Sequence, residues 1–258
     1  MPSDAPDIGD EVSTDLLLGG RLRLLQPARG HRAGTDAALL AAAAPADFAG
    51  EAVDIGAATG AVGLALALRA PAARVRLVEL DARLAGLAHR NVALNGLEAR
   101  VTVTQGDILA RFAARRAAGL AQESADLALT NPPYLDASTH RASPDVARSG
   151  AHVMPAEGLE AWIKAAAGLL RVRGALVVVH RADALPAVLR AMGPRFGDVA
   201  ALPVHPRAGE PASRVLVRGL KGGRGPFRLC AGIVLHQDGG AFTPFAEALH
   251  RGKAVLAW

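Results

Sequence analysis

The stretch "AVDIGAATGAVGLALALRA", Ala52 to Ala70, joins two different patterns through a short turn. It opens with an apolar run that is interrupted only by Asp54, which is typical of a buried strand. From Ala61 onward, alanine and leucine recur with the spacing of a helix. The turn between the two patterns contains Gly56 and Gly60. A strand that passes through a glycine-rich turn into a helix predicts the start of a βαβ unit.

The same alternation continues along most of the chain. We expect strands over residues 74–80, 100–107, 125–134, 175–181, 199–206 and 213–220, and helices over residues 34–44, 82–96, 158–174 and 182–193. Apolar strands alternating with helices indicate a parallel sheet that is covered on both faces. The sequence therefore predicts a doubly wound, Rossmann-like α/β fold, mostly parallel, with a late antiparallel strand.

Length and composition indicate a single core. The chain has 258 residues, of which 51% are hydrophobic, so one sizeable core can form. We expect an N-terminal extension over residues 1–30, a main domain over residues 31–219 and a C-terminal extension over residues 220–258, to which the sequence assigns no role. The oligomeric state also stays open.

Charge and cysteine content exclude some classes of protein. The net charge is +5, but the cations are spread along the chain and only three are lysines, so basicity alone does not decide for a nucleic-acid partner. The single cysteine, Cys230, excludes an internal disulfide and a cysteine-rich zinc site. The histidines lack metal-ligand spacing, so no metal is expected. The acidic N-terminus has no signal-peptide pattern, and the longest apolar run ends at Pro45. These features predict a soluble, cytoplasmic protein without membrane contact.

Four polar residues fall at the carboxyl ends of predicted strands: Asp54, Glu79, Asp107 and Asn131. Ligands of open α/β sheets bind at this edge, where the strand order reverses. A carboxylate at the position of Glu79 suits a ribose diol and therefore an adenosine cofactor. Asp107 suits an adenine amino group, although it also fits an ordinary turn.

The glycine turn departs from a dinucleotide site at one position. Ala58 stands where that site has its middle glycine, and a methyl group there crowds a pyrophosphate. The turn therefore favours a ligand without a pyrophosphate. The glycines are equally consistent with a tight turn that only packs the helix on the sheet.

Several motifs together resemble a known family. "VDIGAATG", "VELD", "GDI" and "NPPY" occur in the order typical of class I S-adenosylmethionine-dependent methyltransferases. With "GHRAGTDAALLAA" upstream and "LTNPPYLDAS" and "VARSGAH" downstream, the chain resembles the bacterial tRNA-valine adenine N6-methyltransferases over roughly residues 15–219. After "VAR", "SGAH" stands where relatives tend to carry an acidic residue, which leaves the substrate open.

The resemblance implies roles for single residues. In the S-adenosylmethionine site, the methionine part is assigned to Asp54, Gly56 and Gly60, its amino acid end to Thr35 and Asp36, the ribose to Glu79, and the adenine ring to Asp107 and Ile108, with Asn131 beside the cofactor. Without the resemblance, "GTDAALLAAAA" predicts a helix with its N-cap at Thr35 or Asp36. Both readings can hold together.

"NPPY", Asn131 to Tyr134, carries the expected chemistry. An adenine N6 amine is a poor nucleophile because its lone pair is delocalised into the ring. The Asn131 side-chain oxygen and the Pro132 carbonyl can accept from its two N–H bonds and free that lone pair. Pro132 and Pro133 restrict the backbone that carries these two acceptors and keep Asn131 in an extended conformation. Tyr134 offers a stacking face for the base. A plain strand-terminating turn is the simpler alternative.

The resemblance implies RNA as the partner, with the target adenine in an exposed loop beside a tRNA anticodon. Four arginines are assigned to contacts with the RNA phosphates: Arg141, Arg148, Arg207 and Arg214. For each of them, a solvent-exposed surface arginine without a function is an equal alternative. Three other functions stay open. The same pair of acceptors suits a release-factor glutamine amide or a guanine N2 amine in rRNA. A methyltransferase fold without catalysis could also serve as an RNA-binding module. The glutamine enzymes normally carry an N-terminal helical domain, and only about 30 residues precede the first unit here, which counts against that alternative.

Overall fold

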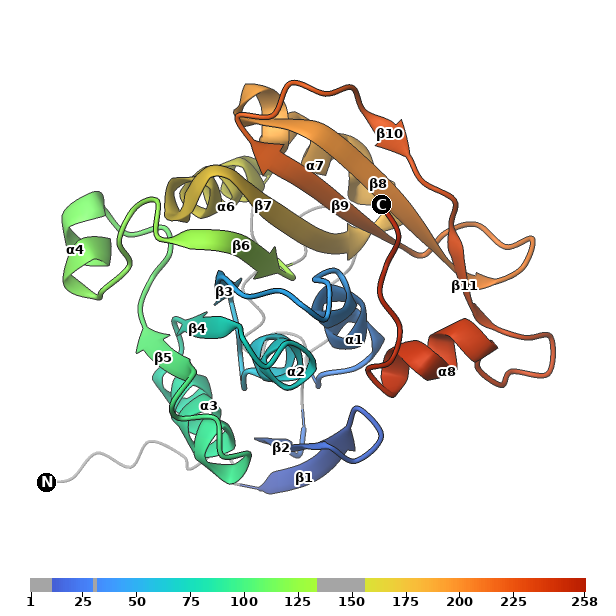
Figure 1. Cartoon of the computed structure of the whole chain (residues 1–258), viewed down its shortest axis with the longest axis horizontal. Coiled ribbons are helices and arrows are strands. Elements are labelled where there is room, and N and C mark those ends of the chain that lie inside the picture. The colour runs from blue at the N-terminus through green and yellow to red at the C-terminus, as the bar shows by residue number, and fades with distance from the viewer. Residues whose placement is uncertain (1–10, 30–31, 134–155) are drawn as a thin grey trace, which may run out of the picture.

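The computed structural model describes residues 11–29, 32–133 and 156–258. One sheet of nine strands runs through these residues (Figure 1). Its strands are β3 (Glu51–Ile55), β4 (Arg74–Glu79), β5 (Val101–Gln105), β6 (Ala125–Thr130), β7 (Leu170–Arg181), β8 (Phe196–Arg207), β9 (Arg214–Lys221), β10 (Arg228–Leu229) and β11 (Ile233–His236). The order across the sheet is β10-β8-β9-β7-β6-β3-β4-β5, with β11 beside β8.

Strand direction confirms the predicted fold class. Strands β5, β4, β3, β6 and β7 are parallel, whereas β9 is antiparallel to both β7 and β8. The chain moves outward from β3 through β4 to β5 and then returns to the other side of β3 with β6. The strand order therefore reverses between β3 and β6, and the carboxyl ends of these two strands lie next to each other.

Helices cover both faces of the sheet and divide the core in two. The helices are α1 (Thr35–Ala42), α2 (Ala61–Arg69), α3 (Ala82–Leu94), α4 (Phe112–Ala117), α6 (Ala156–Leu169), α7 (Leu185–Met192) and α8 (Pro244–His250), with 3₁₀ turns η1 (Ala182–Ala184) and η2 (Gly193–Arg195). Helices α1, α2, α3 and α8 share one core cluster, and α6 and α7 share the other. Alternate residues of β6 belong to different clusters. Leu127 and Leu129 lie in the cluster of α1, α2, α3 and α8, and Ala128 lies in the cluster of α6 and α7.

An N-terminal hairpin packs outside the main sheet. It consists of β1 (Val12–Leu17) and β2 (Leu22–Pro27). Asn91 of α3 and Asn95, the C-cap residue of that helix, bind the unpaired edge of β2 as a neighbouring strand would. Asn91 exchanges two hydrogen bonds with the backbone of Leu25 (2.7 and 2.9 Å), and Asn95 does the same with Arg23 (2.9 and 2.7 Å). The hairpin edge is thereby satisfied without a third strand.

The C-terminal residues continue the fold. Strands β10 and β11 extend the sheet beyond β8, and α8 packs against α1 (Figure 1). The Leu256 N–H donates to the Ala42 carbonyl over 3.1 Å. The Arg218 guanidinium lies 5.1 Å from the centre of a Trp258 ring, within cation–π range.

Several element boundaries differ from the sequence-based expectation, and two of the differences have a clear cause. The helix expected to reach residue 174 ends at Leu169, and β7 begins at Leu170, because Leu170 pairs with Ala125 of β6. The N-cap expected at Thr35 or Asp36 is Gly34, and Thr35 is already helical.

Candidate active site

The turn after β3 follows the backbone that its glycines permit. Gly56 and Gly60 have φ values of +71° and +90°, in the region that favours glycine. A Cβ on Gly60 would lie 2.8 Å from a methyl group of Leu77, and one on Gly63 would lie 2.2 Å from the same side chain. The glycines therefore let α2 begin close against β4.

Ala58 and Glu79 join this turn to the end of β4. Ala58 has a φ of +47°, which is unusual for a residue with a side chain. Its N–H donates to Glu79 Oε2 over 2.7 Å, and the Asp81 N–H donates to Glu79 Oε1 over 2.9 Å. A carboxylate has about four lone-pair sites, so both oxygens retain one for a ligand hydroxyl. The Glu79 carboxylate is thus held in one orientation at the sheet edge.

Asp54 is buried inside the turn. Its Oδ2 accepts from the Gly63 N–H over 2.9 Å. Burial raises the pKa of Asp54 to about 7; the Gly63 hydrogen bond opposes this shift, and the nearby Glu79 charge adds to it. A cationic ligand group at this turn would favour the ionised form.

Asp107 and Ile108 follow β5 on the same edge. Asp107 is exposed, and its Oδ1 accepts from the Leu109 N–H over 2.7 Å, which closes a short turn. Ile108 is buried in the core cluster that also contains Val53 and Val78. Their assignment to an adenine ring stays a prediction.

Thr35 and Asp36 contact distant parts of the chain. Thr35 Oγ1 lies 3.4 Å from Nε2 of His250 in α8. Asp36 Oδ2 accepts from Arg214 Nε, at the start of β9, over 3.2 Å. These tertiary contacts take the place of the expected N-cap. They connect the "GTDA" segment to the late strands and to the C-terminal helix.

Asn131 follows β6 directly beside the turn, since Ile55 and Thr130 are register partners. The Asn131 side-chain oxygen is buried, and no described residue donates a hydrogen bond to it. Buried acceptors are normally satisfied, so an open one indicates a place for a donor from a ligand. Pro132 is buried and Pro133 half-buried behind it.

Two positioning contacts escaped the sequence analysis. The Trp162 Nε1–H of α6 donates to Thr130 Oγ1 over 3.0 Å, and that hydroxyl donates to the Ile55 carbonyl over 2.9 Å. Asn91 donates to the Thr59 carbonyl over 2.9 Å as well as to the hairpin. An asparagine at a core-facing helical position and a threonine directly before "NPPY" were the available signals.

The remaining predicted residues divide into two groups. Tyr134, Arg141 and Arg148 lie outside the described residues. Arg207 ends β8 and Arg214 begins β9, both at the carboxyl edge of the parallel strands. In the described ranges, no three His, Cys, Asp or Glu side chains are placed to hold a metal ion, and no helix is long and apolar enough to cross a membrane.

The reversed strand order, the glycine turn, the strand-end glutamate and the Asn-Pro-Pro segment together define a class I S-adenosylmethionine-dependent methyltransferase. The chain belongs to the methyltransferase small domain family, which residues 31–203 match. Its cofactor is S-adenosylmethionine. The open Asn131 oxygen and the oriented Glu79 carboxylate fit such a group.

Similar proteins agree with this class. The tRNA1(Val) (adenine(37)-N6)-methyltransferase of Porphyromonas gingivalis is 33% identical over 202 residues, which are 74% of this chain and 77% of that protein. A structure described as a predicted O-methyltransferase, Atu636 from Agrobacterium tumefaciens, is 34% identical with a TM-score of 0.74, covering 86% of this chain and 99% of the other. The release factor glutamine methyltransferase of Chlorobaculum tepidum is 31% identical over 153 residues; the match covers 57% of this chain and 51% of that protein.

Proposed function

We propose that this methyltransferase methylates the N6 amine of an adenine in a tRNA loop. The observation that carries the proposal is the buried Asn131 oxygen, which accepts no hydrogen bond from the described residues and lies at the switch point of the sheet. The relative from P. gingivalis, whose name specifies adenine 37 of a tRNA, supports the substrate class. An amine with two N–H bonds is the kind of group that such an acceptor orients.

The chain's own groups account for the chemistry. When bound, S-adenosylmethionine supplies an electrophilic sulfonium methyl group. Asn131 Oδ1 and the Pro132 carbonyl each accept a hydrogen bond from one of the two N6–H groups. These hydrogen bonds let the nitrogen pyramidalise and direct its lone pair toward that methyl group. Asn131 is uncharged, so it orients the amine and does not act as its base. As the new N–C bond forms, the bond from the methyl group to the cofactor sulfur would break, and the proton displaced from N6 would pass to solvent. Acceptors preorganised in this way contribute roughly 3 kcal/mol each to transition-state stabilisation.

The cofactor residues divide the binding task. Glu79 binds the ribose diol with the lone pairs that its two backbone donors leave available. Asp54, Gly56 and Gly60 hold the methionine part, at the turn whose backbone conformation the two glycines permit. Thr35 and Asp36 adjoin the amino acid end, and Asp107 with Ile108 the adenine.

The proposed substrate requires the base to leave its stack. Unstacking is cheapest where the nucleotide is already unpaired, as in a loop, whereas in a duplex it costs a few kcal/mol. A site at the edge of the sheet therefore favours an adenine in a loop over one in a helix.

A labelling experiment tests the substrate. The protein is incubated with methyl-labelled cofactor and separate pools of unmodified tRNA, rRNA and release factor, and each labelled pool is digested. We expect label in tRNA, recovered as N6-methyladenosine by nucleoside mass spectrometry. Label recovered as N2-methylguanosine from rRNA would contradict the adenine assignment.

A glutamine amide is the second candidate, because it is also a planar conjugated nitrogen with two N–H bonds. The similarity to the C. tepidum release factor enzyme favours it, over about half of that protein. Label that enters the release factor and not the RNA would establish this alternative. Label in none of the pools, together with intact cofactor binding, would favour a non-catalytic role.

A further inference from the structure

Two arginines face each other across the ends of two strands. Arg181 is the last residue of β7, Arg214 is the first residue of β9, and the two are direct partners in the antiparallel register. Like charges that are directly opposite in a strand pair destabilise it. A place where a sequence breaks such a local rule is a candidate for a functional site.

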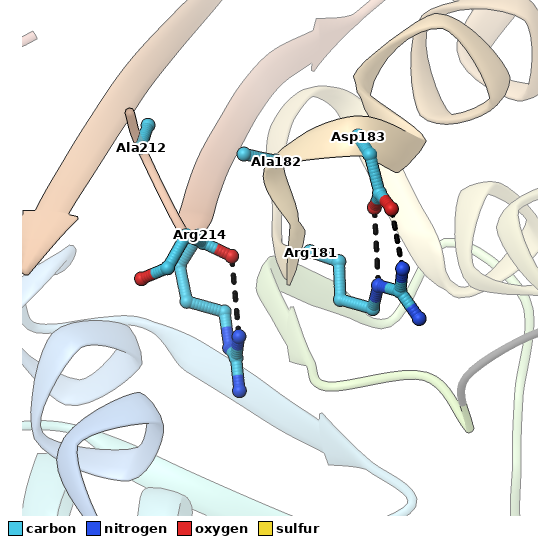
Figure 2. Close-up of a pocket in the computed structure, with 6 residues that line it drawn as sticks. Arg181, Ala182, Asp183, Ala212 and Arg214 are labelled. Atoms are coloured by element: carbon cyan, nitrogen blue, oxygen red, sulfur yellow. Dashed lines mark hydrogen bonds and ion pairs between the residues drawn. The ribbon is translucent and has the colours of Figure 1, made fainter. Parts of the chain in front are cut away.

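The pair lines a hollow of about 450 Å³. Figure 2 shows Arg181 and Arg214 on neighbouring strands, with the Arg181 side chain turned toward Asp183. The rest of the lining consists of small residues: Ala182, Ala212 and Ser213. Small residues leave room for a group that reaches both guanidinium ions.

The hollow lies on the side of the sheet where the reaction is expected. Thr130 of β6 is the register partner of Val178 of β7, and the two strands are adjacent and parallel. Asn131 follows the carboxyl end of β6, and Arg181 lies at the carboxyl end of β7. Arg207 ends β8, which lies beyond β9 and runs parallel to β7. Arginines thus occupy this edge on three consecutive strands that lead away from Asn131.

Each arginine of the pair already has an acidic neighbour. Arg181 Nε donates to Asp183 over 3.1 Å, and Arg214 Nε donates to Asp36 over 3.2 Å. All four side chains retain some solvent exposure, and ion pairs of this kind contribute little to stability. The carboxylates therefore orient the guanidinium groups without preventing them from binding a stronger anion. The Arg214 guanidinium also donates to the Ser213 carbonyl over 3.1 Å.

We propose that Arg181 and Arg214 form a subsite for one backbone phosphodiester of the RNA, beside the nucleotide whose base reaches Asn131. This inference rests on the proposed RNA function and adds the residues that orient the strand. A phosphodiester presents two unesterified oxygens that can bridge two guanidinium ions, and it relieves their mutual repulsion. Because the contact is to the backbone, it positions the RNA without reading its sequence.

The test compares two charge-matched double variants. Arg181→Gln/Arg214→Gln removes the proposed subsite. Arg171→Gln/Arg173→Gln removes the same charge from the other end of β7, where each arginine also pairs with an aspartate, Asp126 or Asp198. Binding of labelled, unmodified tRNA is measured between about 50 and 200 mM salt.

We expect the subsite variant to bind tRNA about tenfold more weakly at low salt, with a salt slope that is less steep by about 1. The control variant should bind like the wild type. Arg181→Gln alone provides a second variant that leaves the Asp36 contact intact, and we expect it to weaken binding in the same direction. Thermal unfolding verifies that each variant is folded.

Different failures have different meanings. If the wild-type protein methylates tRNA but both double variants bind tRNA as tightly as the wild type does, the subsite is wrong and the proposed function stands. Equal weakening in both would show a general charge effect and would also overturn the subsite. If the wild type binds no tRNA and labels the release factor, then the proposed function and the RNA subsite are both wrong, and the arginines would bind an acidic peptide segment instead.

Discussion

The indole N–H of Trp162 donates a hydrogen bond to the Thr130 hydroxyl over 3.0 Å, inside the core. Through Thr130 the contact reaches the Ile55 carbonyl at the end of β3. A Cβ on Gly56 would lie 3.2 Å from the Trp162 ring, so the indole also packs beneath the cofactor turn. One side chain thus touches both strands that meet at the switch point.

We expect Trp162→Phe to lower turnover more than cofactor affinity. The phenyl ring keeps much of the packing but leaves the Thr130 hydroxyl without its donor, so Asn131 loses part of its positioning. A small displacement of a catalytic group can lower the rate by roughly 10²-fold. Turnover and cofactor affinity are measured separately, by methyl transfer and calorimetry.

Thr130→Val provides the partner for a double-mutant cycle. If the hydrogen bond carries the effect, the two changes together should lower turnover little more than either alone. Fully additive effects, or a loss of turnover that only follows a loss of folded protein, would show that Trp162 is merely a core residue.

Glu79→Ala should weaken S-adenosylmethionine binding by about 1.5–3 kcal/mol, which is the range for hydrogen bonds to a charged group. The change also removes the acceptor of the Ala58 and Asp81 N–H groups, so the turn itself is affected. Glu79→Gln is the matched variant, because it retains an acceptor oxygen while losing the charge. Calorimetry that gave wild-type affinity for a folded Glu79→Ala protein would remove the ribose assignment.

The positions of Asp54, Glu79 and Asn131 could be predicted because each lies at or next to the carboxyl end of a mostly apolar strand. Parallel strands place such ends along one edge, so the sequence pattern alone brought these residues to the site. The antiparallel register was not visible in the same way. That Arg181 faces Arg214 depends on how β9 pairs with β7, which no local pattern specifies.

Other features depend on contacts between distant segments. The helix expected to reach residue 174 ends earlier because Leu170 pairs with β6, which overrides its local helical pattern. Thr35 and Asp36 find partners 215 and 178 residues away, so their capping preference was not expressed. The hairpin β1–β2 was missed, and its unpaired edge depends on two distant side chains, Asn91 of α3 and Asn95 at the C-cap of that helix.

Asp54 should make the stability of the cofactor-free protein depend on pH. Its folded pKa of about 7 lies above the ordinary value of 3.8, so the unfolded chain ionises first. The carboxyl group therefore destabilises the fold progressively as pH rises from about 4 to about 7, and by a constant amount above that.

Asp54→Asn should remove this dependence while keeping an acceptor for the Gly63 N–H. We expect the variant and the wild type to be similarly stable near pH 4 and the variant to be relatively more stable above pH 7, by up to about 4 kcal/mol. Urea unfolding across this range measures the difference. A stability difference that did not change with pH would show that Asp54 keeps an ordinary pKa.

Ala58→Gly should leave the protein equally stable or up to about 1 kcal/mol more stable. The left-handed backbone costs a residue with a Cβ about 1–2 kcal/mol, and the greater freedom of glycine in the unfolded chain offsets about 0.5–1 kcal/mol of the gain. Ala57→Gly, at the buried neighbour without a positive φ, should destabilise the protein. Equal destabilisation by both changes would show that Ala58 is not strained.

Asn131→Ala should separate catalysis from cofactor binding. The Asn131 oxygen has no donor among the described residues, so its removal breaks no described hydrogen bond, and the fold should tolerate the change. Turnover should fall by roughly 10²-fold or more, since one of two preorganised acceptors is lost. Cofactor affinity should stay within a few-fold of the wild type.

Asn131→Asp is a second variant at this position, which keeps an acceptor but adds a negative charge at the same edge of the sheet as Glu79 and Asp54. The added charge should strengthen binding of the cationic cofactor relative to its neutral product. If the Asn131→Ala variant methylated its substrate at a near-normal rate, the Asn-Pro-Pro segment would be only a strand-terminating turn and the acceptor argument would fail.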